Sequence, residues 1–104
     1  MNMKNHRTEC CEFEMTVTDV FAFEDGRTVF TGEVRKGPNY IPACKCVLLF
    51  NGTLFARIRI EGEMLPMNSV PQNLRSVSTA DKVDVALVRA SQGTCELKAD
   101  ALNN

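Results

Sequence analysis

Hydrophobic and polar residues alternate along much of the N-terminal half of the chain. The apolar residues before the Asp25-Gly26 pair recur with a period of two: Phe13, Met15, Val17, Phe21 and Phe23. This is the period of a strand that buries one face. Asp25 and Gly26 both tolerate the positive φ that tight hairpins require. The pattern therefore predicts a hairpin whose strands cover residues 12–23 and 27–35.

A second hairpin is predicted around Asn51-Gly52, a strong turn sequence. The loop length decides which side chains face the core, because a one-residue slip turns every side chain to the other face. A two-residue loop, with Phe50 paired to Thr53, mixes apolar and charged residues on one face. A three-residue loop, with Leu49 paired to Thr53, separates them. Its apolar face carries Cys44, Cys46, Leu48, Leu54, Ala56 and Ile58. The sequence therefore favours the three-residue loop with a bulge.

The C-terminal half of the chain is less regular. Residues 61–79 include Pro66 and Pro71, and this segment is predicted to be a long loop because proline cannot donate to a β-ladder. Such a loop is either functional or a crossover between sheets. Alternation returns over residues 81–89, which predicts a fifth strand, and residues 94–99 are predicted to form a sixth. No helix is expected.

Six short strands of this kind predict an all-β fold. Closing them into an antiparallel barrel removes the exposed edges that otherwise promote aggregation. The barrel is expected to form one domain over residues 12–100, after a flexible arm over residues 1–11 and before a frayed end over residues 101–104. The side chains expected in its core are Val29, Leu48, Ile58, Val85 and Leu87.

The composition of the 104 residues, 44% of them hydrophobic, fits one domain with one core. Its longest apolar runs are far shorter than the roughly 20 residues that a membrane-spanning helix needs. The basic residues near the N-terminus precede no apolar stretch of the kind found in secretory signals. A cytoplasmic protein without a membrane partner is therefore expected. The net charge of −1 gives no overall electrostatic case for binding DNA, and RNA is less favoured than a protein partner.

The chain holds five cysteines: Cys10, Cys11, Cys44, Cys46 and Cys95. Their spacings differ from the Cys-x-x-Cys pairs of zinc sites, and the single histidine, His6, lies in the predicted arm. An odd number of cysteines without a secretory signal indicates reduced thiols, with Cys44 and Cys46 as small apolar residues of the core. No metal and no cofactor are expected.

No group of residues in the sequence predicts catalysis. The acidic residues of the first hairpin are explained more simply by a solvated strand face and a turn than by a tuned acid–base pair. A nucleophile pair would have to recruit His6 from the predicted arm. The chain is therefore expected not to be an enzyme, and redox chemistry at Cys10-Cys11 is the least favoured alternative.

A candidate partner-binding surface lies on the fourth predicted strand. Arg57 and Arg59 are two residues apart and therefore share a face. A solvated face that blocks edge-to-edge aggregation is the simpler interpretation, and a binding patch is the alternative. Methionines of the 61–79 loop are either core plugs or an adaptable contact surface. The candidate partner-binding residues are Lys45, Phe55, Arg57, Arg59, Met64 and Met67.

Three short pieces of the sequence follow a family pattern. The most specific piece comprises Asp19, Gly26, Arg27, Thr28, Val29, Thr31, Gly32 and Val34. The other two comprise Gly37, Ile41 and Val47, and then Ala80-Asp81-Lys82-Val83 with Ala86-Leu87. In this order they resemble the second domain of the translational GTPases, the β-barrel that follows the nucleotide-binding domain in elongation factor Tu. The first piece is similar to that family's D-V-F … G-R-G-T-V-x-T-G-x-V run.

The chain also departs from that family. Thr28 directly follows Arg27, so the second glycine of the family's G-R-G turn is missing. The chain has no Gly-x-x-x-x-Gly-Lys-Ser/Thr phosphate loop. The resemblance therefore implies a barrel like the second domain of translation proteins, without GTP hydrolysis. In the family, this domain packs against the GTPase domain and helps to contact the acceptor end of tRNA or the ribosome.

Two functions of different classes remain open. The first is a non-catalytic binding module, a monomer or weak oligomer, that docks on a protein or ribonucleoprotein partner. The second is a small immunity or antitoxin-like protein that blocks a single effector protein through an acidic face.

Overall fold

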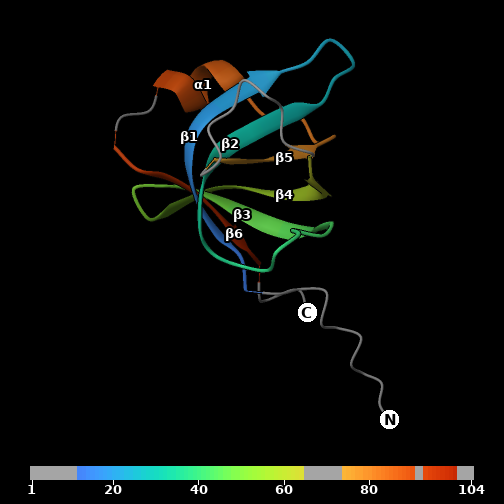
Figure 1. Ribbon diagram of the computed structural model, residues 1–104. Coiled ribbons are helices and arrows are strands. Elements are labelled where there is room, and N and C mark those ends of the chain that lie inside the picture. The colour runs from blue at the N-terminus through green and yellow to red at the C-terminus, as the bar shows by residue number, and fades with distance from the viewer. Residues whose placement is uncertain (1–11, 65–73, 91–92, 101–104) are drawn as a thin grey trace.

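The computed structural model describes residues 12–64, 74–90 and 93–100 of the chain. Within these residues it holds six strands and one helix (Figure 1). The elements are β1 (Glu14–Ala22), β2 (Thr28–Lys36), β3 (Cys44–Phe50), β4 (Thr53–Glu63), β5 (Arg75–Thr79), α1 (Val85–Ala90) and β6 (Cys95–Ala99). No helix in this part of the chain has the length and apolar character needed to cross a membrane. The predicted arm, the predicted frayed end and Met67 lie outside the described residues.

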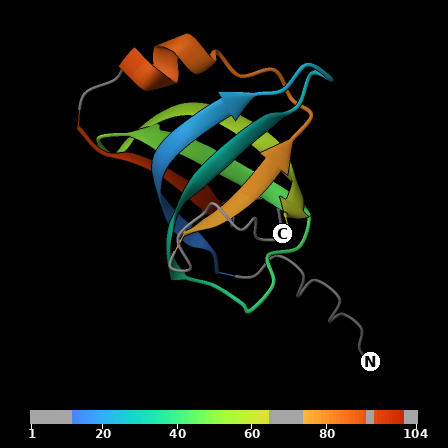
Figure 2. The same ribbon diagram turned by 45° about the horizontal axis from the view of Figure 1, so that its top comes forward.

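The six strands form one antiparallel sheet that closes on itself in the order β1-β2-β5-β4-β3-β6, a closed barrel. β6 completes the ring by pairing with β3 on one side and with β1 on the other. Figure 2 shows α1 at one end of the ring, close to β1, which it contacts. The prediction of an all-β fold with six antiparallel strands is therefore confirmed.

The predicted fifth strand over residues 81–89 is wrong. Part of this segment forms α1, and Asp84 caps the helix by accepting a hydrogen bond from the backbone N–H of Leu87 at 3.0 Å. Val85 and Val88, three positions apart on the helix, pack toward the core, whereas Leu87 is 47% exposed. The fifth strand of the ring is β5, which lies inside the segment predicted to be a loop.

The first hairpin forms as predicted, but its alternation changes phase. The tip turns at Gly26, which has φ of +95° and donates its N–H to the carbonyl of Phe23 at 3.0 Å. The register of β1 on β2 shifts between Val17 and Asp19, which marks a bulge. Beyond the bulge, Val20 is buried and Phe21 is 39% exposed. The bulge therefore places Phe21 outside, although the period of two predicted it on the face of Val17.

The second hairpin has a two-residue loop, so the predicted three-residue loop is wrong. Asn51 and Gly52 have φ of +52° and +83°, and Phe50 pairs with Thr53. The bulge that restores the separation of faces lies further along β4, between its residues 54 and 56. Beyond it, Ala56, Ile58 and Ile60 face the ring interior together with Cys44, Cys46 and Leu48. Leu54, which was predicted on this face, is exposed.

The interior of the ring is a single apolar core. The buried side chains include Phe13, Met15, Val20, Phe30, Ile41, Leu48, Ile60, Val77 and Leu97. Burial of Val29, Leu48 and Ile58 is confirmed, whereas Val85 is half-buried and the predicted burial of Leu87 is wrong.

Candidate functional site

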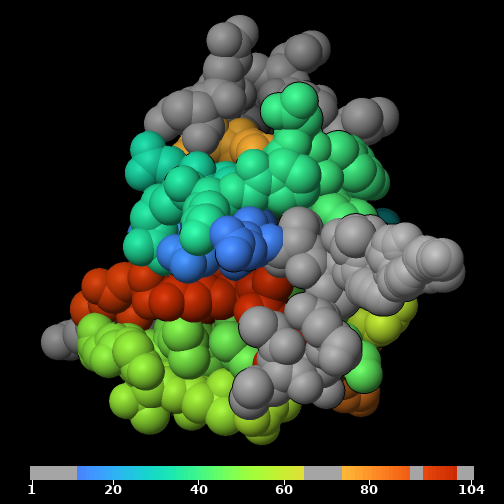
Figure 3. Space-filling model, turned by 90° about the horizontal axis from the view of Figure 1, so that it is seen from below, coloured from blue at the N-terminus to red at the C-terminus, as the bar shows by residue number. Residues whose placement is uncertain are grey.

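The outer side of β6, β3 and β4 carries four basic side chains, here called the cationic face: Lys45, Arg57, Arg59 and Lys98. Lys45 pairs directly with Arg59 across β3 and β4. Val47, the next outward position on β3, pairs with Arg57 on one side and with Lys98 on the other. Arg57 and Lys98 therefore flank Val47 on the neighbouring strands, and Lys45 precedes it on β3. The opposite faces of these strands form the core. In Figure 3, the red band of β6 runs between the blue start of β1 and the green β3–β4 hairpin.

One cation of the face has an acidic partner. Arg57 lies 3.5 Å from the carboxylate of Asp100, whose side chain is 4% exposed. Among the described residues, the side chains of Lys45, Arg59 and Lys98 form no ion pair. Like charges that face each other across a strand pair cost free energy unless a ligand neutralises them. The arrangement of Lys45 opposite Arg59 is therefore one that an acidic partner would stabilise.

Apolar side chains are exposed near the tip of the β3–β4 hairpin. Phe55 at the β4 bulge stacks on Phe50, with 4.4 Å between the ring centroids, and is 36% exposed. Leu54 is exposed beside it. The bulge interrupts the alternation of faces here, so Phe55 lies at the hairpin end of β4 against Phe50, which packs against the core.

The structure brings together part of the predicted partner-binding set. Lys45, Arg57 and Arg59 form one surface, with Phe55 at its hairpin end. Met64 lies beyond the opposite end of β4, where its N–H donates to the carbonyl of Ser76 at 2.8 Å. Met64 therefore does not belong to the cationic face, and the set is not a single site.

Sequence reasoning missed Lys98. The alternation of Glu96 and Lys98 in the last strand indicates an outward charged face, but it does not show which strand lies next to it. Lys98 joins the cationic face only because the ring closes by pairing β6 with β3.

The motif residues that resemble the translation-factor barrel have structural roles in the first hairpin. Gly26 makes the turn, and Arg27 pairs with Asp25 beside it at 2.9 Å. Gly32 has no room for a side chain, because a Cβ there would overlap the backbone carbonyl of Thr16. Thr28, Val29 and Thr31 are buried, and Val34 packs against the core. Asp19 lies at the β1 bulge. These residues shape the hairpin.

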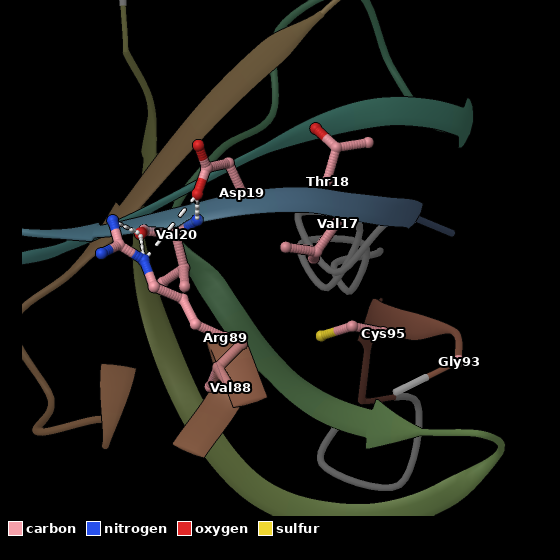
Figure 4. A pocket seen from close by; sticks show the side chains of 8 residues that line it. All are labelled: Val17, Thr18, Asp19, Val20, Val88, Arg89, Gly93 and Cys95. Atoms are coloured by element: carbon pink, nitrogen blue, oxygen red, sulfur yellow. Dashed lines mark hydrogen bonds and ion pairs between the residues drawn. The ribbon is translucent and has the colours of Figure 1, made fainter. Parts of the chain in front are cut away.

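A pocket of about 270 Å³ opens between β1, the end of α1 and the start of β6 (Figure 4). Its lining residues are Val17, Thr18, Asp19, Val20, Val88, Arg89, Gly93 and Cys95. Burial raises the pKa of the Cys95 thiol to about 11, so this thiol stays protonated at neutral pH. Sequence reasoning missed the pocket, because Val20 and Arg89 are 69 positions apart.

The other described cysteines belong to the core. The Sγ atoms of Cys44 and Cys46 lie 3.7 Å apart, and both residues are buried. The hydrogen bond between them lowers the pKa of the Cys44 thiol against the opposing effect of burial. The described part of the chain holds no cluster of three or more Cys, His, Asp or Glu side chains that could bind a metal ion.

On the described part of the chain, the cationic face and the pocket are two surface features with the chemistry to bind a partner. The first offers charge and apolar area on a rigid sheet, and the second offers a small cavity beside a strand edge. Comparisons of the chain with protein-family models, curated proteins and solved structures found no match.

Proposed function

We propose that this chain is a non-catalytic binding module, similar to the second barrel domain of the translational elongation factors, that docks on a protein or ribonucleoprotein partner. The observation that carries the proposal is the cationic face. Four basic side chains from three neighbouring strands gather on a protein whose net charge is −1. A local concentration of positive charge against an acidic overall balance favours an acidic surface as the partner.

The position of these charges on strands supports a docking role. Lys45, Arg57, Arg59 and Lys98 project from a closed sheet whose inner side is packed, so their backbones are held in place before a partner arrives. Such preorganisation lowers the entropic cost of binding. Val47 at the centre adds an apolar contact that can be covered by the partner.

The sequence pattern around the first hairpin supports the likeness to the elongation factor barrel. Two glycines of the family-like run lie where only glycine fits the backbone. Gly26 has positive φ at the turn, and Gly32 lies against the backbone of Thr16 on β1. Since a fold hosts many functions, the translation-factor role rests on the sequence resemblance and on the cationic face together.

Charge reversal of Lys45 and Arg59 tests the proposal. The two side chains oppose each other, so Lys45→Glu with Arg59→Glu replaces one like-charged pair by another and spares the Arg57–Asp100 pair. A matched control, Arg27→Glu with Lys36→Glu, makes the same change in net charge on β2 and its hairpin. Circular dichroism and thermal unfolding would establish that both variants fold.

Immobilised wild type and both variants would then be incubated with cell extract, with and without nuclease, at several salt concentrations. Wild type and control are expected to retain RNA or ribosomal protein, and the Lys45/Arg59 variant is expected to lose it. Retention should fall steeply with salt. Equal retention by all three proteins would exclude the cationic face. A single stoichiometric protein that is retained after nuclease treatment and by both variants would instead favour the immunity or antitoxin-like alternative.

A further inference from the structure

β1 has an open edge along its C-terminal half. In the described part of the chain, β1 pairs with β2 along its whole length but with β6 only from Glu14 to Thr16. Beyond Thr16, no described residue of β6 pairs with β1, and the pocket of about 270 Å³ lies between β1, the end of α1 and the start of β6. The pairing of β1 with β6 that closes the ring therefore involves only the N-terminal end of β1.

The backbone groups of Val20 and Ala22 point toward this open edge. The N–H of Phe23 donates to the carbonyl of Arg27 on the β2 side at 2.8 Å. Because the backbone groups of successive residues point to opposite sides of a strand, Phe21 also faces β2, and Val20 and Ala22 face the gap.

Two side chains take the place of a neighbouring strand at Val20. Its N–H donates to Oδ1 of Asp19 at 2.8 Å. Its carbonyl accepts hydrogen bonds from Nε and Nη2 of Arg89 at 3.0 and 2.7 Å. Figure 4 shows the guanidinium of Arg89 reaching from α1 to β1. We call this arrangement the Asp19–Arg89 clip.

The clip can open without disturbing the core. The side chains of Asp19 and Arg89 are 50% and 54% exposed, and their charged groups lie 3.9 Å apart. An ion pair with this exposure contributes little to stability. Both side chains can therefore move into solvent and release the N–H and carbonyl of Val20.

The surroundings of the edge fit a peptide better than a small molecule. At about 270 Å³ the pocket is smaller than the roughly 300–1,000 Å³ of typical small-molecule sites. Its accessible lining is mainly polar, and Val17, Val20 and Val88 contribute the smaller apolar part, so the pocket suits one short side chain. On the outer side of the same strand, Phe21 is 39% exposed with the guanidinium of Arg89 5.7 Å from its ring centroid, so opening the clip also uncovers this ring for a residue paired across the edge.

We propose that the open edge of β1 is a docking site for an extended peptide segment of a partner protein. The segment pairs its backbone with Val20 and Ala22, displaces the Asp19–Arg89 clip and places a short side chain in the pocket. Main-chain hydrogen bonds supply the affinity in this mode of recognition, and the pocket supplies specificity. The site is separate from the cationic face and does not depend on the function proposed for it.

Selection of a phage-displayed random heptapeptide library on the folded chain tests the proposal. Peptides in which β-branched residues alternate with residues of short side chain are expected, and the best would be synthesised for titration calorimetry and amide hydrogen exchange. Binding should slow exchange at the Val20 and Ala22 amides. A library that enriches no peptide, or peptides that leave these two amides unprotected, would overturn the proposal.

Three variants locate the binding. Ala22→Pro removes the N–H that faces the gap and is expected to weaken binding at least tenfold, while Ala22→Ser keeps the N–H and binds like wild type. Arg89→Ala opens the clip and is expected to strengthen binding about threefold or more. Equal affinity of Ala22→Pro and wild type, or weaker binding by Arg89→Ala, would contradict the proposal. The Lys45→Glu, Arg59→Glu variant should bind the peptides unchanged, which separates this result from that for the cationic face.

Discussion

Arg75 on β5 holds the carboxylate of Glu63 on β4 through two hydrogen bonds, of 2.8 Å from Nε and 2.6 Å from Nη2. The same guanidinium donates to the backbone carbonyls of Pro38 and Asn39, and Glu63 accepts the N–H of Ile41 at 3.1 Å. This pair therefore ties the connection between β2 and β3 to two strands of the ring. Charge-assisted, two-pronged pairing of this kind is among the stronger polar interactions in proteins.

Arg75→Ala is expected to lower the free energy of unfolding by about 1–3 kcal/mol, because it leaves the Glu63 carboxylate without its cation. The Glu63 side chain is 13% exposed, so water replaces the lost hydrogen bonds incompletely. Urea unfolding followed by circular dichroism would measure the change. Arg27→Ala is the matched control, since it removes a pair with Asp25 at the exposed hairpin tip and should leave the midpoint unchanged. Equal effects of the two substitutions would contradict the role assigned to Arg75.

The same pair predicts a pH dependence. Hydrogen bonds from Arg75 hold the pKa of the Glu63 carboxyl below its ordinary value of 4.5. The unfolded chain therefore binds this proton more tightly than the folded chain does, and stability falls as the pH falls through this range. The stabilisation by Glu63 is fully present above its unfolded pKa and is lost as the pH drops through its folded pKa. Urea midpoints between about pH 5 and 3 should fall more steeply for wild type than for Arg75→Ala. Parallel pH profiles would show that Glu63 is not coupled to Arg75.

The β3–β4 hairpin shows how far a hydrophobic pattern can predict register. The separation of Cys46 and Ile58 from Arg57 depends on one extra residue in the hairpin, and the pattern predicted that such a residue exists, but the prediction placed it wrongly, in the turn. The pattern does not say where the extra residue lies. The structure places it at the β4 bulge and leaves Asn51-Gly52 as a two-residue turn. Asn at the first turn position, which tolerates positive φ, was the local indication of this turn.

The segment of α1 was mispredicted for a different reason. Val83, Val85 and Leu87 alternate over too short a window to distinguish a strand from a helix, and Val85 with Val88 also fits the helical period. The decisive feature is Asp84, whose carboxylate caps the helix.

The position of Lys98 and the Asp19–Arg89 clip depend on ring closure. Residues of β6 and α1 meet β3 and β1 only after the chain has passed around the sheet. Local periodicity carries no information about such long-range neighbours. For this reason the cationic face was predicted only in part, and the pocket was not predicted at all.

Gly32→Ala is expected to destabilise the fold severely, by about 3 kcal/mol or more. Gly32 lies in β2 opposite Val17, and an added Cβ would come within 2.9 Å of the Val17 Cα as well as overlapping the carbonyl of Thr16. The obstacle is backbone and cannot rotate away. Thermal unfolding would measure the effect, with Gly26→Ala as a control whose Cβ meets nothing within 4 Å and which tests backbone strain alone. A smaller loss for Gly32→Ala than for Gly26→Ala would show that β1 and β2 do not approach this closely.

A final prediction contrasts two leucines that the alternation pattern placed together in the core. Leu48 on β3 is fully buried, whereas Leu87 on α1 is 47% exposed. Leu48→Ala should therefore cost about 2–4 kcal/mol, because it removes buried methyl groups and leaves a cavity inside the ring. Leu87→Ala should change stability by less than about 0.5 kcal/mol, since the side chain is largely in solvent and alanine favours the helix. Urea unfolding of the two variants under one condition measures both. Comparable losses would mean that residues 81–89 form a buried strand, as their alternation predicted, and that α1 does not lie at the end of the ring.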